Sequence, residues 1–361
     1  MRGRSKMKKV FNGILACLIA ASMLAGCAGT TSSSPSAPSA ETSGADAQAS
    51  PAPDISVSAA NDGVERKSQV ITIACGTSAG VGYVTTTTTG AILNKLYPEY
   101  QIKPELTTGS QENVNLITQG VAQIGVCMAD SALAAYNGER EFNESTKGKI
   151  NFITGGYITT ITQFVPKNST AKSLADLKGK KIGVSKGVMS QFYFPTILKA
   201  YGLSESDFNI SVLSIGDITA GVQDGNLDYG VHVASTPNTA ISDLAMSAGI
   251  NLLTMSDDIR DKIIEENPYF QKVTIEKDVY STEDDSDTLA TRNVYICSTD
   301  ADEQVVYDWI KTLIEYHDDI ALAHPQAGDF GGKDGANALE GQLIPIHPGA
   351  ERYYKEIGLI K

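Results

Sequence analysis

The stretch GTSAGVGYVTTTTTG at residues 76–90 decides how this chain folds. It follows VITIAC (70–75), an apolar run typical of a buried strand, and precedes the helical pattern AILNKL (91–96). A glycine-rich turn between a strand and a helix directs backbone N–H groups to a position where the helix dipole favours an anion. Threonine is a weak helix former, so five consecutive threonines require a reason. Either their hydroxyls help to hold an anion, or they pack inside the protein.

This loop matches neither of two common phosphate-binding motifs. No Gly-Lys-Ser/Thr follows it, and its Gly-x-x-x-Gly-x-Gly spacing differs from the dinucleotide fingerprint. A second loop, TTGSQEN (107–113), follows a predicted strand (101–108) and places Ser110 at a helix cap. Asp130 ends a third predicted strand (122–129), where it could cap the next helix or accept a hydrogen bond from a ligand. Because open α/β sheets bind ligands beyond the carboxyl ends of their strands, the three loops predict a ligand site.

Strands and helices alternate in this way twice, and a long extended connector (150–168) separates the two sets. The second set has predicted strands at 181–187, 208–215 and 229–235, with a helix at 190–202. A further strand (292–300) precedes a strongly periodic helix (305–323). Such alternation predicts an α/β fold with mostly parallel strands and right-handed crossovers. Two lobes joined by crossing strands would leave a cleft between them, which is a preferred place for a small ligand.

The first 27 residues are expected to be a signal sequence rather than part of the fold. Five basic residues precede the uncharged apolar run ILACLIAASMLA (14–25), which is shorter than a membrane span. The following Leu-Ala-Gly-Cys resembles a bacterial lipobox, which implies lipid attachment at Cys27; the alternative is a plain signal peptide with a chance cysteine. Residues 28–69 are rich in Ser, Ala and Pro and are expected to form a disordered tether. The protein is therefore predicted to be extracytoplasmic and membrane-attached by its lipid alone.

Charge and composition limit the possible functions. The net charge of −13 argues against nucleic acid or an anionic membrane surface as a partner, although a small anionic ligand responds to local dipoles. Cys75, Cys127 and Cys297 lie in apolar strand-like runs and are expected to be buried free thiols, although one disulfide stays possible. The four histidines show no metal-ligand spacing, and no catalytic pair is evident. We therefore expect no metal, no cofactor and no enzymatic activity.

Five motifs occur in an order that resembles one family of receptors. They are GTSAGVGYV, TTGSQEN, MADSALAAYNG, SLADLKGKKIGV (173–184) and IPIHPGAERYYKEIGL (344–359). This order is similar to that of TAXI-family solute receptors, the extracytoplasmic binding proteins of tripartite ATP-independent periplasmic (TRAP) transporters. The resemblance covers nearly all of residues 70–361. It implies a two-lobed type II periplasmic-binding-protein fold with hinge strands, which closes over a small anionic solute such as glutamate, a dicarboxylate or a 2-oxoacid. It also implies delivery of that solute to the integral membrane subunits of the transporter.

The resemblance also implies a division into lobes and a set of site residues. Lobe 1 comprises residues 70–160 and 280–361, and lobe 2 comprises residues 161–279. The predicted ligand-binding residues, most of them carried over from the matching motifs, are Gly76, Thr77, Ser78, Gly82, Tyr83, Thr107, Gly109, Ser110, Asn113, Asp130, Ser185, Ser190, Ser235 and Pro237. In this hypothesis residues 76–83 and the first threonines hold a carboxylate without an arginine, and the later threonines face the packing of the lobe.

The chain departs from the family pattern where the shape of a ligand would be recognised. Tyr83-Val84 stands where two aromatic residues are usual, SKGVMS (185–190) replaces a Gly/Ser-rich loop, and Ser235 replaces a glycine. Lys186 could supply a cation to the cleft or point to solvent. Two other classes stay open: a ligand-sensing receptor for a signalling partner, and an enzyme on a binding-protein scaffold.

Overall fold

The computed structural model describes residues 57–78 and 80–361, all within one compact unit of the chain. The predicted signal sequence, the predicted lipidation site Cys27 and the first part of the predicted tether lie outside the described residues. The structure therefore leaves these three expectations as predictions.

Three parallel strands form the first group of the sheet: β1 (Gln69–Gly76), β2 (Tyr100–Leu106) and β3 (Ile124–Met128). A helix follows each strand, namely α1 (Val81–Leu96), α2 (Ser110–Thr118) and α3 (Ala129–Asn137). In the sheet β1 lies between β2 and β3. The strands and helices that the sequence predicts for this part of the chain are confirmed.

A second parallel group repeats this arrangement. It consists of β5 (Lys181–Ser185), β6 (Asn209–Leu213) and β7 (Tyr229–Ala234), with β5 between the other two. A π-helical turn, η2 (Met189–Tyr193), leads from β5 into α4 (Phe194–Tyr201). The helices that follow β6 and β7 are α5 (Ile215–Gln223) and α6 (Thr239–Ser247).

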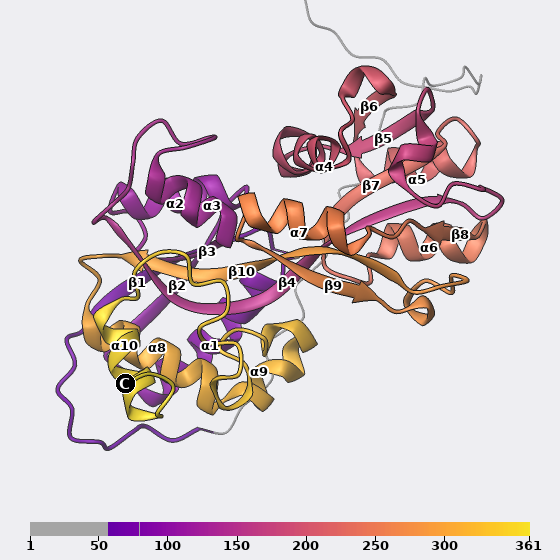
Figure 1. Ribbon diagram of the computed structural model, residues 1–361. Helices are drawn as coiled ribbons and strands as arrows, with labels where there is room; N and C mark the ends of the chain where they lie inside the picture. Colours follow the sequence, from indigo (N-terminus) through magenta and orange to yellow (C-terminus); the bar gives the residue numbers. More distant parts are fainter. Residues whose placement is uncertain (1–56, 79) are drawn as a thin grey trace, which may run out of the picture. The chain divides into compact units, whose positions relative to one another are not determined.

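Two long antiparallel strands join the groups (Figure 1). β4 (Ile150–Pro166) pairs with β7 of the second group, and β10 (Ser286–Ser298) pairs with β3 of the first. The continuous order is β2-β1-β3-β10-β4-β7-β5-β6, with β8 (Ile250–Leu252) on β4 and β9 (Phe270–Ile275) on β10. This topology confirms the predicted α/β fold with two groups of parallel strands, because crossing strands link the groups.

The other helices and helical turns of the described residues lie between or after these strands. They are η1 (Leu174–Leu177), η3 (Glu205–Asp207), α7 (Asp257–Glu266), η4 (Lys277–Val279), α8 (Glu303–Glu315), α9 (His317–Ala323), η5 (Pro325–Ala327), η6 (Lys333–Gly335) and α10 (Pro348–Glu356). The prediction of a single helix over 305–323 is wrong in one respect, because two helices occupy this segment: α8 ends at Glu315 and α9 begins at His317. The residue between them, Tyr316, has a φ of −104° and a ψ of 24°, which depart from helical values.

Each parallel group has helices on both faces, with a hydrophobic cluster under each layer. In the first group, α1, α8 and α10 pack on one face around Trp309 and Tyr295, and α2 and α3 pack on the other (Figure 1). In the second group, α4 and α7 cover one face, whereas α5 and α6 cover the other. Sheets covered on both faces are the expected setting for parallel strands.

The five threonines belong to α1 and lie in its packing. Thr85 and Thr86 are fully buried; the Thr85 hydroxyl donates to the Val81 carbonyl at 2.9 Å, and Thr86 Oγ1 lies 2.8 Å from the Tyr295 hydroxyl. The expectation that the first threonines help to hold a carboxylate is therefore wrong for these two residues. A Cβ on Gly90 would lie 2.8 Å from Ile102, so a small residue lets this helix approach the sheet closely.

Residues 57–68, at the end of the predicted tether, carry specific contacts. Arg66 has a side chain only 4% exposed, and its Nε donates to Asp308 Oδ2 on α8 at 2.8 Å. Its guanidinium carbon lies 3.7 Å from the centroid of the Tyr97 ring. The predicted boundary at residue 69 stays a prediction, and these contacts favour an earlier start of the folded part.

The three cysteines of the folded part are buried and free, as the sequence indicates. Among the residues that the structure describes, no helix is long and apolar enough to cross a membrane.

Candidate functional site

Glycines mark three of the strand ends. Gly76 after β1, Gly109 after β2 and Gly187 after β5 have φ values of +91°, +132° and +85°. A Cβ at these positions would meet nothing within 4 Å, so backbone conformation, rather than lack of space, explains the glycine. Turns of this kind direct backbone groups outward at the carboxyl ends of both parallel groups.

The first loop leaves a helix N-terminus without a side-chain cap. Thr77 and Ser78 are exposed, and Gly80 is the cap residue of α1. Among the described residues, no side chain caps α1, and its first turn has no acidic residue. By contrast, the first turns of α2 and α3 contain Glu112 and Asp130. Of these three helix starts, α1 is the best suited to an anion.

Two other predicted residues near this loop have structural contacts. Gly82 is buried, and a Cβ there would lie 2.8 Å from the Cys75 carbonyl oxygen, so glycine is required for α1 to pack on β1. Tyr83 is half-buried and packs against the core of the first group. Contact of either residue with a ligand stays a prediction.

The second loop is tied to its neighbours by hydrogen bonds. The Gly76 N–H donates to Thr107 Oγ1 at 3.0 Å, and the Thr107 hydroxyl donates to Asn113 Oδ1. The Asn113 amide donates to the Val126 carbonyl at 2.5 Å, and the Met128 N–H donates to Ser110 Oγ at 3.1 Å. These side chains hold the ends of β1, β2 and β3 in register. Contact of these residues with a ligand stays a prediction.

Asp130, at the start of α3, forms an ion pair that the sequence analysis does not predict. Its side chain has no exposed surface, and Arg140 Nη1 donates to Asp130 Oδ2 at 2.6 Å. Arg140 also donates to Glu141 Oε2 at 3.2 Å. Burial alone would lower the pKa of the Arg140 guanidinium, but the charges of Asp130 and Glu141 outweigh it and raise that pKa. Arg140 stands in no recognisable motif, so only the structure, which brings it next to Asp130, identifies it as a partner of this carboxylate.

Arg140 also reaches the second parallel group. Its guanidinium carbon lies 4.1 Å from the centroid of the Phe192 ring, which belongs to the turn η2. Met128, at the end of β3, likewise packs against the core of the second group. The carboxyl ends of the two groups therefore meet, as the prediction of a shared cleft requires.

A pocket of about 380 Å³ lies where they meet. The first group lines it with the start of α2 and with Arg140 and Glu141, and the second group lines it with Gly187, Val188, Gln191 and Phe192. Of the predicted site residues, Gly109 and Ser110 line this pocket.

The predicted residues of the second group occupy different positions at the ends of β5 and β7. Ser185 is buried, and Ser190 Oγ donates to the Gly187 carbonyl at 3.1 Å. Ser235 is half-buried and Pro237 is exposed. Lys186 is exposed, which corresponds to the solvent-facing alternative for this lysine.

Several buried polar atoms near these strand ends have no hydrogen-bond partner among residues 57–78 and 80–361. They are Asp130 Oδ1, Ser185 Oγ, Tyr193 OH, His232 Nδ1 and Thr236 Oγ1. Most buried polar groups in folded proteins are hydrogen-bonded, so a cluster of exceptions indicates where water or a ligand fits. Two of the five are predicted site residues. Burial lowers the pKa of His232 to about 4.

Sequence reasoning misses Arg140, Phe192 and Tyr193. The aromatic run QFYF (191–194), directly after a glycine turn, is the one signal that could have identified the two aromatic residues.

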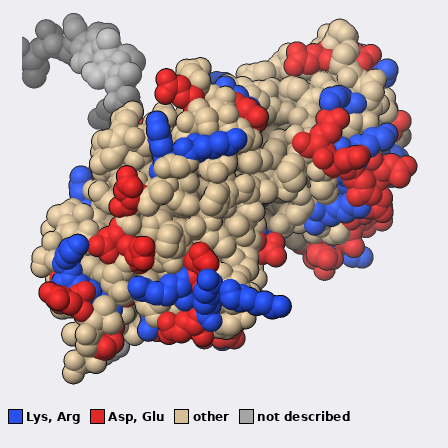
Figure 2. Space-filling view, turned by 60° about the vertical axis from the view of Figure 1, so that its left-hand side comes forward, with Lys and Arg blue, Asp and Glu red and all other residues tan. Residues whose placement is uncertain are grey.

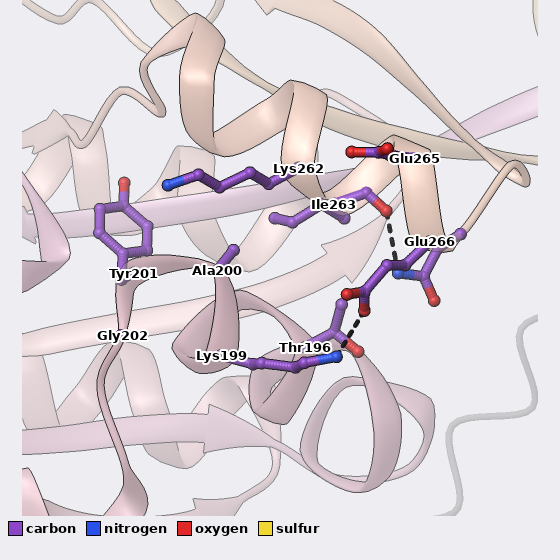
Figure 3. Close-up of a pocket in the computed structure, with 10 residues that line it drawn as sticks. Thr196, Lys199, Ala200, Tyr201, Gly202, Lys262, Ile263, Glu265 and Glu266 are labelled. Atoms are coloured by element: carbon purple, nitrogen blue, oxygen red, sulfur yellow. Dashed lines mark hydrogen bonds and ion pairs between the residues drawn. The ribbon is translucent and has the colours of Figure 1, made fainter.

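A second pocket, of about 440 Å³, lies between α4 and α7 (Figure 3). Lys199 and Glu266 form an ion pair across it at 2.6 Å, and Lys262 and Tyr201 also line it. None of the predicted site residues line this pocket, and its charges have both signs. The pocket between the parallel groups is therefore the better candidate.

Charge and metal-ligand geometry restrict the chemistry further. Figure 2 shows acidic side chains gathered on the right-hand part of this face, with basic side chains among them. In the right-hand part of that face, this mixture leaves no continuous basic surface of the kind that binds nucleic acid. In the part of the chain that the structure describes, no group of three or more His, Cys, Asp or Glu side chains could hold a metal ion.

The fold and the pocket define a class of α/β protein in which two parallel strand groups share a pocket at their carboxyl ends. Residues 73–358 match the family described as the NMT1-like family, so the chain belongs to the NMT1-like family.

Three solved structures are similar to this chain. The periplasmic aliphatic sulphonate binding protein SsuA from Escherichia coli is 17% identical, with 79% of this chain and 78% of that chain covered and a TM-score of 0.48. XAC2383 from Xanthomonas citri, bound to chloride ion, is 12% identical over 80% of this chain and 96% of its own, with a TM-score of 0.46. The alkanesulfonate-binding protein SsuA from Xanthomonas axonopodis pv. citri, bound to MOPS, is 15% identical over 81% and 85%, with a TM-score of 0.43.

Proposed function

We propose that this protein is an extracytoplasmic solute-binding protein that captures a small anionic solute, namely an amino acid such as glutamate, a dicarboxylate or a 2-oxoacid. Its lipid anchor is Cys27, and it delivers the solute to the membrane subunits of a TRAP-type transporter. The transporter type and the solute class come from the resemblance to TAXI-family receptors. The protein acts by binding and not as an enzyme.

The observation that carries the proposal is the shared pocket at the ends of β2, β3 and β5. Ligands bind to open α/β sheets at this edge, and a pocket lined by two strand groups is suited to closure around a solute. The uncapped N-terminus of α1 supports an anionic solute, because an acidic residue is absent from its described first turn. In this proposal Gly76, Thr77 and Ser78 donate to the carboxylate, with the α2 start as a second donor.

Titration calorimetry of the full chain with L-glutamate, succinate and 2-oxoglutarate tests the proposal. A hydrogen bond to a charged group contributes about 1.5–3 kcal/mol, so Thr77→Val should weaken binding roughly 10- to 100-fold. Ser110→Ala should also weaken binding, since it removes a hydroxyl donor from the pocket lining and the contact that holds the end of β3 beside it. Thr170→Val, at an exposed threonine of the second group, is the matched control and should bind as the wild type does.

Unchanged affinity in both Thr77→Val and Ser110→Ala would reject the proposed carboxylate site. Turnover of any of the three compounds would instead favour the enzyme alternative. The sensing-receptor alternative would gain support if the solute-bound protein formed a stable complex with a signalling partner.

A further inference from the structure

Two polar side chains lie side by side at the carboxyl end of the second group. Ser185 is the last residue of β5, and His232 lies near the end of β7. The parallel register of these strands pairs Val184 with Val231, so the next residues along each strand, Ser185 and His232, are neighbours across the pair. Because neighbouring strands lie about 4.8 Å apart, one polar group placed between the two side chains can contact both.

Both side chains lie on the same face of the sheet. A Cβ on Gly183 would meet Ile218 of α5 at 3.0 Å, and a Cβ on Gly230 would meet the same residue at 2.6 Å. Side chains return to one face of a strand at every second residue. Ser185 and His232, two residues further along β5 and β7, therefore lie on the α5 side together.

Burial and unpaired atoms distinguish these two residues from ordinary polar residues of a sheet. Ser185 is 3% exposed and His232 is half-buried. Within the described residues, neither Ser185 Oγ nor His232 Nδ1 has a hydrogen-bond partner. Buried polar groups are rarely left unpaired, because an unpaired group loses its bonds to water without replacement. The two atoms therefore mark a position that suits a polar group of a bound molecule.

This position adjoins the proposed solute pocket. Gly187, two residues after Ser185, lines the pocket between the strand groups. Ser235 and Pro237, both predicted site residues, come shortly after His232, beyond the end of β7. The pair therefore belongs to the edge of the second group at which α/β sheets bind their ligands.

The chemistry of the pair favours an uncharged group. Burial lowers the pKa of His232 to about 4, so its imidazole is neutral at pH 7 and offers one donor and one acceptor. The Ser185 hydroxyl can also donate or accept. Lys186, the next residue, is exposed. A carboxylate or an ammonium group between these two side chains would be buried without a counter-ion, whereas a keto or hydroxyl group needs none.

We propose that Ser185 and His232 form a subsite of the second group that binds an uncharged keto or hydroxyl group of the solute. This inference rests on the proposed solute-binding function and selects one of its solute classes, the 2-oxoacid or the hydroxyacid with the same carbon skeleton. The start of α1 holds a carboxylate of that solute, and the pair binds its uncharged polar group.

Titration calorimetry of the full chain with four acids of one carbon skeleton tests the subsite. Glutarate has no substituent beside its carboxylate, whereas 2-oxoglutarate has a keto group, 2-hydroxyglutarate a hydroxyl group and L-glutamate an ammonium group. The keto or the hydroxyl compound should bind at least about tenfold more tightly than glutarate, because glutarate leaves both buried atoms unpaired.

Ser185→Ala and His232→Phe should each weaken binding of 2-oxoglutarate roughly 2- to 10-fold and leave glutarate binding unchanged, since glutarate has no group to bond there. Ser286→Ala is the matched control. It removes another buried serine hydroxyl, at the start of β10, but this hydroxyl already donates to the Leu253 carbonyl at 2.8 Å. The control should preserve the ratio of the two affinities. A purely structural role would change both affinities in the same proportion.

The inference would be overturned, with the proposed function intact, if the wild-type chain bound glutarate or L-glutamate as tightly as 2-oxoglutarate. Variants that left the ratio of the 2-oxoglutarate and glutarate affinities unchanged would overturn it as well. A wild-type chain that binds none of the four acids would instead overturn the proposed function together with this inference.

Discussion

Replacement of Arg66 by alanine gives the sharpest test of where the folded part of the chain begins. Asp308 has no exposed side-chain surface, and four donors converge on it: Arg66 Nε at 2.8 Å and Nη2 at 3.0 Å, Tyr100 OH at 2.9 Å and Gln304 Nε2 at 2.9 Å. Arg66 supplies the only full positive charge among these donors. Without it, a buried carboxylate is left with two neutral donors.

The expected cost is large because breaking a buried ion pair leaves an uncompensated charge. Such changes lower the free energy of unfolding by about 3–5 kcal/mol. For a folded part of this size, the melting temperature should fall by on the order of 10 °C. The loss of the cation–π contact with Tyr97, 3.7 Å from the guanidinium carbon, acts in the same direction.

Urea unfolding of Arg66→Ala, followed by tyrosine fluorescence and by circular dichroism, measures this cost. Asp62→Asn is the matched control, since Asp62 binds the same guanidinium at 2.7 Å but is 35% exposed. Partly exposed pairs contribute about 0–1 kcal/mol, so this control should be nearly as stable as the wild type. If Arg66→Ala loses no more stability than Asp62→Asn, residues 57–68 are not an integral part of the fold.

Two further predictions concern packing and pH. Gly82→Ala should destabilise the protein by about 1–3 kcal/mol, because the new Cβ would lie 2.8 Å from the Cys75 carbonyl oxygen. Thermal melts measure this loss. The matched control is Gly216→Ala in α5, where a Cβ would meet no heavy atom nearer than 4.0 Å, and it should be neutral or stabilising. Burial lowers the pKa of His232 from 6.5 to about 4, so the unfolded chain takes up a proton before the folded chain does. His232 therefore contributes stability that is full above about pH 6.5 and is lost as the pH falls towards 4, by about 3 kcal/mol in total. Urea titrations of His232→Gln should show a shallower loss over this pH range, and an unchanged slope would contradict the assignment.

The alternation of strands and helices was predictable because it is a local property. VITIAC and its continuation form β1, and the glycine that ends this strand has the positive φ that a tight turn requires. The predicted parallel pairing of β1 with β2 and β3 brings the predicted loops to one edge of the sheet. The sequence did not predict the order of the strands, but it did predict that extended segments cross between the two groups, as β4 and β10 do.

Long-range contacts were not predictable in this way. Arg66 binds Asp308, which lies 242 residues further along the chain, and the Ser/Ala/Pro-rich composition of the segment before Arg66 does not indicate that contact. The threonine run shows the same limit, because the hydroxyl of Thr86 meets that of Tyr295 from a strand far along the chain. Composition and spacing describe the average environment of a segment, whereas burial of a single side chain depends on the fold.

Asp130 shows how a role within one helix and a role between the two strand groups can coexist. The sequence places it at the start of a helix, where a carboxylate is favourable whatever the protein does. A capping role alone does not require a buried guanidinium, yet Arg140 adopts a left-handed backbone conformation and binds one oxygen of this carboxylate. The other oxygen of this carboxylate has no hydrogen-bond partner within the described residues. Because the Arg140 guanidinium also lies 4.1 Å from the centroid of the Phe192 ring, this ion pair ties the start of α3 to the second strand group, which a helix cap alone would not do.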